Sequence, residues 1–425
     1  MMHLTRRGFL GTAGTLAILS QTRVSAQEKI TLRVTAAPSL VADMYKEMAA
    51  AFEASHPDIA VQIDATLRDY DGLVEATLRD NLTGQIADVS IQGNNKARIY
   101  ADRGLVEPLD DLFEAEIASP QTTLSPSVAS IGRIGGKIYG LGLSVSVPLL
   151  FFNADLVRKA GGNPANPPTD WEGVLELARK MNDPATDTLG AYYAYDQSGA
   201  WFWIALIGSQ SAPMMNAAET EIGFGGPEGL RALQVLKAFG EAGQSAVDMP
   251  RDQVRQLFAA GKLGILADSS SSLGIFEKQA AGRFEVGTWP FPRAGATPRL
   301  PAGGAMGIVF AKDPERRKAA WNFLKFAAGA EGQTIIAKSS GYMVANSLVA
   351  SNPDMLGRFF AERPVMKPVV DALPILDGWY AFPGENNGKI IKTITDDMRS
   401  VILLEAEPEA VLASMTADVK ALLPR

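Results

Sequence analysis

In this 425-residue chain, the side chains best suited to bind a ligand carry aromatic rings or hydroxyl groups, and they do not form the pattern of a catalytic nucleophile. Trp201 and Trp203 lie two residues apart at a predicted helix start, so they do not share one helix face. We expect one indole to face a ligand and the other to enter the core, and the sequence does not distinguish them. Asp268 follows an apolar run and precedes Ser269–Ser272, and we expect Asp268 and Ser270 to contact an oxygen-rich ligand near free helix N–H groups. Simple capping of that helix is the alternative.

Chemistry that depends on histidine or cysteine is poorly supported. The chain has no cysteine, which excludes disulfides, thiolate metal sites and cysteine nucleophiles, and its two histidines are His3 and His56. His56 precedes Pro57 at a predicted helix end, where a solvated residue at the helix terminus explains it. No hydrolase nucleophile elbow, phosphate loop or dinucleotide-binding glycine pattern is present in the mature chain. We therefore predict no catalytic residue, no metal and no cofactor, although carboxylate chemistry of the glycosidase kind stays open.

Composition and charge indicate a globular protein of two domains. Hydrophobic residues make up 47% of the chain and charged residues 20%, and the length suits two domains of ordinary size. The net charge of −7 gives no electrostatic reason to bind nucleic acid or an anionic membrane surface. We expect a monomer that binds no nucleic acid.

Residues 1–26 are predicted to be a signal peptide. Arg6 and Arg7 precede a mild apolar run, and Val24-Ser25-Ala26 is a small-x-small cleavage site. The run is too short and too rich in Gly, Ser and Thr for a stable membrane span. The paired arginines favour the twin-arginine (Tat) pathway over an ordinary Sec signal. We therefore expect export to the periplasm without membrane insertion.

The first part of the mature chain alternates between strand and helix patterns. Strands are predicted over 30–35, 59–63 and 87–91, and helices over 41–56, 71–82 and 95–102. This order predicts an α/β fold with parallel strands joined by right-handed crossovers. Farther along, a helix is predicted to begin near Pro168, with Thr169 and Glu172 forming a capping box.

The segment Gly136–Asn153 changes pattern half-way. Its first half alternates, with Ser144 and Ser146 on the polar face, whereas Leu149–Phe152 is apolar at every position. We expect the segment to leave one lobe, to line a cleft with its two serines and to enter the core of a second lobe. Gly- and Pro-rich breaks near 295–307 and 339–346 predict two further crossings between lobes.

The chain resembles the extracellular solute-binding proteins (family 1) of carbohydrate ABC importers, which include maltose-, trehalose- and glycerol-3-phosphate-binding receptors. The family patterns occur in order along nearly the whole mature chain, with Ala87 where proline is usual. The segments that carry the resemblance are Phe52 with His56–Val61, Gly84–Val89, Gly136–Leu141 with Leu150–Asn153, Pro168–Glu172, Phe258–Ile265, and Gly303–Ala305 with Gly341-Tyr342. The overall pattern is most similar to the glycerol-3-phosphate branch.

The resemblance implies a two-lobe periplasmic binding protein fold, also called a Venus-flytrap fold, with three inter-lobe crossings. One lobe would contain 27–144 and 305–340, and the other 145–304 and 341–425. The lobes would close on a small sugar, oligosaccharide or polyol and deliver it to the transmembrane subunits of an ABC permease. Solute that touches both lobes only in the closed form shifts the population toward closure.

Alignment with the family adds residues to the expected site. It places a binding tyrosine at Tyr70 and an acidic or amide ligand position near Asn94. Ser144 and Ser146 lie at the first crossing, and glycines at the second would let the backbone approach a solute. The remaining expected site residues are Gly303, Gly304, Tyr342 and Trp379.

The solute itself stays open. The glycerol-3-phosphate branch uses an arginine near the position that aligns with Ile391, and here Lys389 and Lys392 do not match it cleanly. A neutral sugar or polyol is therefore preferred, with glycerol-3-phosphate or another phosphorylated polyol as the alternative.

Two other functions remain open. An exported carbohydrate-active enzyme would need two acidic residues facing one sugar, about 5–10 Å apart. A receptor that serves only a chemoreceptor or a sensor kinase would have the same sequence features as an importer receptor.

Overall fold

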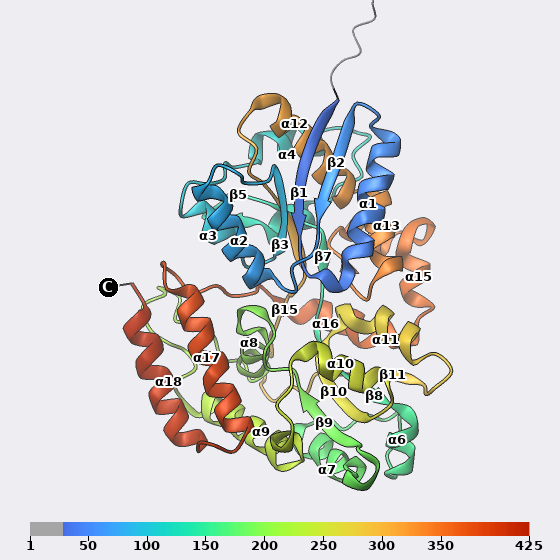
Figure 1. Cartoon of the computed structure of the whole chain (residues 1–425), viewed down its shortest axis with the longest axis vertical. Coiled ribbons are helices and arrows are strands. Elements are labelled where there is room, and N and C mark those ends of the chain that lie inside the picture. Colours follow the sequence, from blue (N-terminus) through green and yellow to red (C-terminus); the bar gives the residue numbers. More distant parts are fainter. Residues whose placement is uncertain (1–28, 425) are drawn as a thin grey trace, which may run out of the picture.

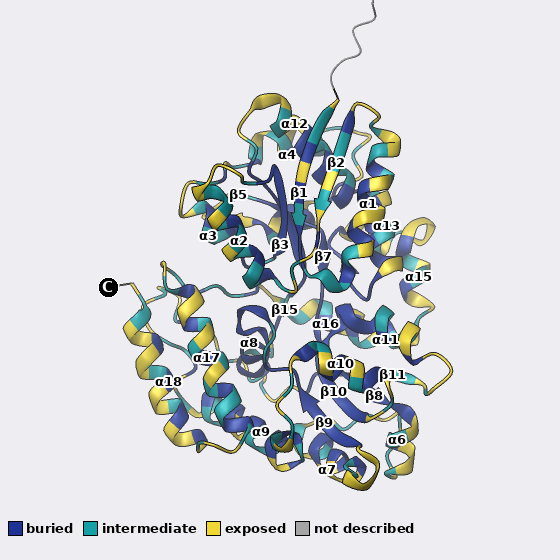
Figure 2. Ribbon diagram, viewed as in Figure 1, coloured by how far each residue is buried: buried dark blue, intermediate teal, exposed yellow. Residues whose placement is uncertain are grey.

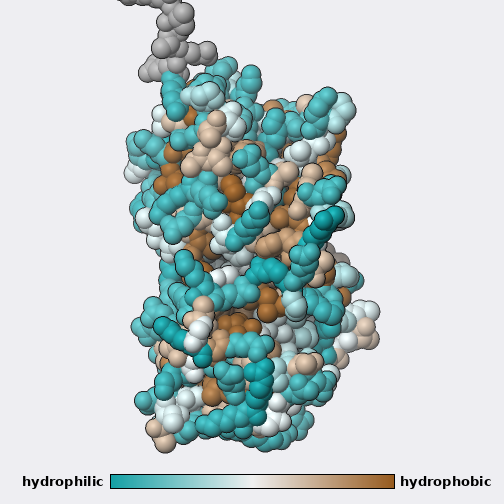
Figure 3. Space-filling model, turned by 90° about the vertical axis from the view of Figure 1, so that its right-hand side faces the viewer, coloured by the Kyte–Doolittle hydropathy of each residue, from teal (hydrophilic) through white to brown (hydrophobic). Residues whose placement is uncertain are grey.

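The computed structural model describes residues 29–424 as two lobes stacked one above the other (Figure 1). Each lobe is built on one β-sheet, whose inner strands are buried, while the outer strands β2 (Ile59–Asp64) and β11 (Val286–Pro290) are mostly half-buried or exposed; the helices around the sheets have exposed outer faces (Figure 2). Seen from the side, the surface is mostly hydrophilic, with small hydrophobic patches (Figure 3). The predicted signal peptide lies outside the described residues.

The first lobe contains a five-stranded sheet in the order β2-β1-β3-β13-β6. β1 pairs in parallel with β2 and β3, as predicted, whereas β13 runs antiparallel to β3 and β6. β13 returns from the second lobe and enters where β3 ends, so it runs in the opposite direction. The strands are β1 (Ile30–Ala36), β2 (Ile59–Asp64), β3 (Val89–Gly93), β6 (Leu141–Gly142) and β13 (Ala305–Val309). The helices are α1 (Ala42–Ser55), α2 (Tyr70–Leu82), α3 (Ala97–Ala101), α4 (Asp110–Ile117), α5 (Pro126–Ile131), α12 (Pro314–Ala328) and α13 (Ala330–Ser339).

The second lobe contains a four-stranded sheet in the order β11-β8-β10-β9. The apolar run Leu149–Phe152 lies in β8, paired on both sides and fully buried, which confirms its predicted place in the second core. The strands are β8 (Pro148–Asn153), β9 (Leu189–Tyr193), β10 (Leu263–Ser269) and β11 (Val286–Pro290). The helices are α6 (Ala154–Lys159), α7 (Trp171–Met181), α8 (Trp201–Gly208), α9 (Pro227–Glu241), α10 (Arg251–Ala259), α11 (Leu273–Ala280), α17 (Asn387–Ile402) and α18 (Pro408–Leu422).

The three predicted crossings lie side by side between the lobes. β7 (Ser144–Val145) pairs antiparallel with β14 (Met343–Val344), and Ser146 forms an isolated bridge with Gly303. The domain boundaries themselves stay a prediction. Asn346, which that prediction assigns to the second lobe, donates from its side-chain amide to Thr123 O (2.7 Å) and Ala328 O (2.8 Å) of the first lobe. The remaining elements are β4 (Arg133–Ile134), β5 (Lys137–Ile138), β12 (Leu300–Pro301), β15 (Leu376–Asp377), α14 (Ser347–Ser351), α15 (Arg358–Ala361) and α16 (Lys367–Ala372).

The predicted capping box of α7 is wrong by one residue. Asp170, not Thr169, is the N-cap, and its Oδ1 accepts from the backbone N–H of Gly173 at 2.8 Å. A carboxylate at this position interacts with the helix dipole as well as with the free N–H group, so it is the better cap. The predicted end of α1 is confirmed: His56 follows it, and its ring stacks on Phe52 at 4.2 Å.

The α17–α18 pair contains a carboxylate that should make stability depend on pH. Burial, followed by nearby Asp418 and Asp396, raises the pKa of Asp397 to about 6. Its Oδ2 is buried without a hydrogen-bond partner among the described residues. Because this pKa lies above the unfolded value, the stabilisation is present below pH ~4 and is lost as the pH rises through 6.

We predict that Asp397→Asn raises the free energy of unfolding at pH 7.5 by about 1–2 kcal/mol, a value reduced for the half-exposed side chain, and leaves it nearly unchanged at pH 4. Urea denaturation at the two pH values measures this difference. Asp371→Asn, at an exposed pair with Lys367, is the control and should show no such pH dependence. An equal effect of Asp397→Asn at both pH values would contradict the prediction.

Candidate functional site

An enclosed cavity of ≈ 20 Å³ lies between the lobes, beside the crossings. Side chains and backbone from both lobes line it, and this volume holds about one water molecule, so the lobes are closed on one another. Of the predicted site residues, those that meet here are Tyr70, Ser146, Trp201, Gly303, Gly304, Tyr342 and Trp379. The other lining residues are Pro38, Leu40, Asp69, Gln197, Ser198, Arg251, Arg255, Ser269 and Ser271.

Four aromatic rings, brought together from distant parts of the chain, border the cavity. The hydroxyl oxygens of Tyr70 and Tyr342 are 3.3 Å apart. The ring centroid of Trp379 is 6.0 Å from that of Tyr70 and 6.1 Å from that of Trp201. Burial raises the pKa of both tyrosines, so each phenol stays neutral and can donate as well as accept a hydrogen bond.

The structure distinguishes the two tryptophans of α8. Trp201 borders the cavity, and its Nε1 donates to Pro301 O at 3.2 Å. Trp203 packs edge-to-face on Phe224, with ring centroids 5.5 Å apart, and is fully buried in the second lobe. Trp201 is therefore the indole that faces the cleft, and Trp203 is a core residue.

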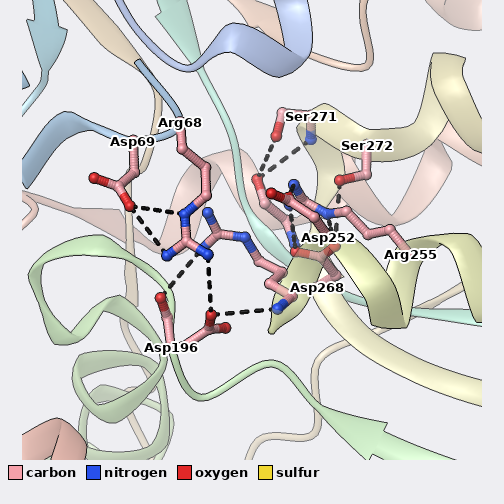
Figure 4. A network of polar contacts seen from close by, with 10 residues as sticks. Arg68, Asp69, Asp196, Asp252, Arg255, Asp268, Ser271 and Ser272 are labelled. Atoms are coloured by element: carbon pink, nitrogen blue, oxygen red, sulfur yellow. Dashed lines mark hydrogen bonds and ion pairs between the residues drawn. The ribbon is translucent and has the colours of Figure 1, made fainter. Parts of the chain in front are cut away.

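Two predicted site residues, Asp268 and Ser270, form hydrogen bonds with other residues of the protein. Both oxygens of Asp268 accept from Arg255, with Oδ2 at 2.6 Å from Nε and Oδ1 at 2.9 Å from Nη2 (Figure 4). The Ser270 hydroxyl accepts from the backbone N–H of Val147 at 3.1 Å. Neither side chain borders the cavity, so their expected contact with a ligand is not supported. The serines of this run that do border it are Ser269 and Ser271.

Asn94 and Ser144 hold the crossings in place. The Asn94 amide donates to Ser144 O (3.2 Å) and to Gly303 O (3.1 Å), while its own Oδ1 is buried without a partner among the described residues. The Ser144 hydroxyl accepts from the backbone N–H of Ala305 at 3.0 Å. Gly304 has a φ of +113°, and a Cβ there would lie 2.2 Å from Ser144 O, so only glycine fits. These residues position the site instead of lining it, apart from Gly304.

Two arginines of α10 are lining residues that the sequence interpretation missed. Arg251 and Arg255 lie four residues apart, on the same buried face as Val254 and Phe258. Arginines on the apolar stripe of a helix are unusual, because buried charges need partners. The spacing of the two arginines, which matches that of the buried apolar residues of α10, is the feature of the sequence that could have indicated their burial.

Contacts outside the cavity also join the lobes. Asp71 Oδ2 accepts from the backbone N–H of Gly199 at 3.1 Å, and Arg98 forms a two-point ion pair with Glu219 at 3.0 and 3.1 Å. A larger open groove of ≈ 1990 Å³ also runs between the lobes, and it contains Asn94 and Trp379. Because most predicted residues meet in the enclosed cavity instead, we take that cavity as the site.

Comparison with known proteins agrees with this architecture. A family model described as bacterial extracellular solute-binding protein matches residues 47–360. The chain belongs to this family. The sn-glycerol-3-phosphate-binding periplasmic protein UgpB of Agrobacterium fabrum is 25% identical over 335 residues, which are 76% of this chain and 73% of that protein.

Two solved structures share the fold of this solute-binding protein. UgpB from Mycobacterium tuberculosis in complex with glycerophosphocholine has a TM-score of 0.79 at 18% identity, covering 93% of this chain and 98% of that chain. An ABC transporter solute-binding protein from Thermotoga lettingae bound with α-D-tagatose has a TM-score of 0.78 at 17% identity, covering 93% and 100%. The predicted family and the two-lobe fold are therefore confirmed. Within 29–424, no helix has the length and apolar composition needed to cross a membrane.

The two tryptophans should respond differently to truncation. We predict that Trp203→Ala lowers the free energy of unfolding by about 3–5 kcal/mol, because it leaves a hole in the packed core of the second lobe. Trp201→Ala should cost less, since one side of this ring borders the cavity and not packed core. Urea denaturation of both variants measures this, and equal losses would contradict the assignment of Trp203 to the core and Trp201 to the cleft.

Proposed function

We propose that this solute-binding protein is the periplasmic receptor of an ABC importer. It binds a sugar, oligosaccharide or polyol between its lobes and delivers it, chemically unchanged, to the membrane permease. The observation that supports this most is the combination of aromatic faces with hydroxyl groups around a cavity that both lobes and all three crossings border. Polyhydroxylated solutes need such a combination of apolar walls and a few convergent polar groups.

The proposed mechanism is closure around the solute. A sugar is larger than the ≈ 20 Å³ cavity, so it enters while the lobes are apart and keeps them wider than in the unliganded closed form. Tyr70 and Tyr342 would each replace the hydrogen bond between their hydroxyls with one to the solute. Trp201 and Trp379 would cover its apolar face. Solute that contacts both lobes favours the closed form, which the permease would recognise.

A phosphorylated polyol is the alternative solute within the same function. The Agrobacterium relative binds glycerol-3-phosphate, and the Mycobacterium neighbour was solved with glycerophosphocholine. At the position where that branch uses an arginine, Ile391 packs against the core, and Lys392 pairs with Asp396 with 74% of its side chain exposed. This region therefore offers no cation to the cavity, which favours a solute without a phosphate monoester.

The lining residues give little support to an enzyme. Asp69 is the one acidic residue among them, and its Oδ1 caps α2 by accepting from the backbone N–H of Gly72 at 2.9 Å. Glycoside hydrolysis needs two carboxyl groups that face one sugar. We propose binding without turnover, by a monomer exported to the periplasm through the Tat pathway.

A thermal-shift screen of sugars and polyols, followed by isothermal titration of each hit, tests the proposal. A true solute at a hundredfold excess over its Kd should stabilise the protein by about 2.7 kcal/mol. Trp201→Ala should abolish this shift, because it removes an aromatic wall of the cavity. The titrated compound should be recovered unchanged. A screen in which no sugar, polyol or phosphorylated polyol raises the melting temperature would refute the proposal, and hydrolysis of the compound would favour an enzyme.

A further inference from the structure

Arg251 is a buried arginine that a neutral solute does not explain. It is 3% exposed and borders the cavity at the start of α10. Its Nη1 donates to the backbone oxygen of Asp196 at 3.2 Å, and its Nε is buried with no hydrogen-bond partner in the described part of the chain. Within residues 29–424, no carboxylate oxygen lies within 4 Å of this guanidinium, because the Asp196 carboxylate binds the Arg251 backbone N–H (3.3 Å) and lies 3.9 Å from Arg68.

The neighbouring arginines, by contrast, have partners. Arg255 is paired through two hydrogen bonds with buried Asp268 (Figure 4). Arg68, 46% exposed at the side chain, pairs with Asp69 at 3.2 Å. Burial, followed by repulsion from Arg255, lowers the pKa of Arg251. Arg251 is therefore the arginine of this group whose guanidinium has no carboxylate in direct contact among the described residues, and the charge of Asp196 acts on it only from a longer distance.

Such a charge has a physical consequence for closure. While the lobes are apart, water can solvate the guanidinium, but closure removes that water and brings no carboxylate of the described residues into contact with the guanidinium. Removing water from an unpaired charge is unfavourable, whereas a paired and hydrogen-bonded charge is tolerated. An anionic group on the solute would pair with the guanidinium, so that burial of the guanidinium would favour closure instead of opposing it. Closure would then depend on the charge of the solute.

We propose that Arg251 binds an oxyanion of single negative charge, a carboxylate or a phosphodiester, on the polyhydroxylated solute. This inference rests on the proposed function and names the class of solute. One guanidinium with a free Nε–H and no direct carboxylate contact among the described residues suits one negative charge, and a phosphate monoester would bring nearly two. The Nε–H of Arg251 donates to the oxyanion, and the hydroxyls of Ser146 and Ser271, which border the same cavity, satisfy its remaining lone pairs.

Isothermal titration with charge-matched pairs of probes tests the inference. The carboxylate pair is D-gluconate and D-glucitol, the phosphodiester pair is glycerophosphoglycerol and glycerol, and glycerol-3-phosphate supplies a dianion. We expect the wild-type protein to prefer one acidic probe to its neutral counterpart by about 10- to 100-fold, as for a hydrogen bond to a charged group. Which pair shows the preference identifies the oxyanion.

Variants assign the preference to Arg251. Arg251→Gln should reduce the ratio of acidic to neutral affinity to near one, and Arg251→Lys should retain part of it, since the charge remains. Arg68→Gln is the matched control at a paired arginine and should leave the ratio unchanged. Circular dichroism of each variant checks that it is folded.

The outcomes separate this inference from the proposed function. Equal affinity of the wild-type protein for acidic and neutral probes overturns the inference and leaves the receptor function standing. An acidic preference that persists in folded Arg251→Gln, or the tightest binding by glycerol-3-phosphate, also overturns it. If no probe of either kind binds and the wider sugar and polyol screen is also silent, the proposed function fails as well.

Discussion

The rest of this structure depends on one constraint. Where the chain crosses between the lobes, its buried backbone groups must form hydrogen bonds. The crossings are covered on all sides, so their N–H and C=O groups must pair with protein. They pair with one another, through β7 and β14 and through the bridge between Ser146 and Gly303. Asn94 then ties the first two crossings together by donating to Ser144 O and Gly303 O. Because the crossings form one unit, the two lobes can enclose a cavity beside them.

Electrostatics inside that cavity follow from the same exclusion of water. Buried Asp268 is tolerated because Arg255 satisfies both of its oxygens. The tyrosine pair stays neutral, since burial raises the pKa of each phenol, and so Tyr70 and Tyr342 keep both donor and acceptor capacity. The Arg251 guanidinium has no carboxylate in direct contact among the described residues, and under the inference above the charge of the solute would become part of the closing equilibrium. The same ion pair between Arg251 and the solute would then increase the affinity and favour the closed form.

Much of the fold could be predicted from sequence, because local periodicity reports burial. The boundaries of α1 and the buried run Leu149–Phe152 agree with their predicted positions, as do the three crossings. Other features were not local. The N-cap of α7 is Asp170 and not Thr169, a choice between adjacent residues that both cap well. The antiparallel direction of β13 depends on which lobe the chain has just left.

The sequence by itself determined the kinds of side chain available, the alternation of strands and helices, the crossing segments and the family. These are properties of neighbouring residues and of ordered motifs, so they can be read along the chain. Only the tertiary structure decided that Trp201 and not Trp203 faces the cleft, and that Asp268 is already paired with Arg255. It also decided that no carboxylate of residues 29–424 contacts the guanidinium of Arg251. A polar side chain is free for a ligand only if no distant part of the chain reaches it first, and that competition takes place in three dimensions.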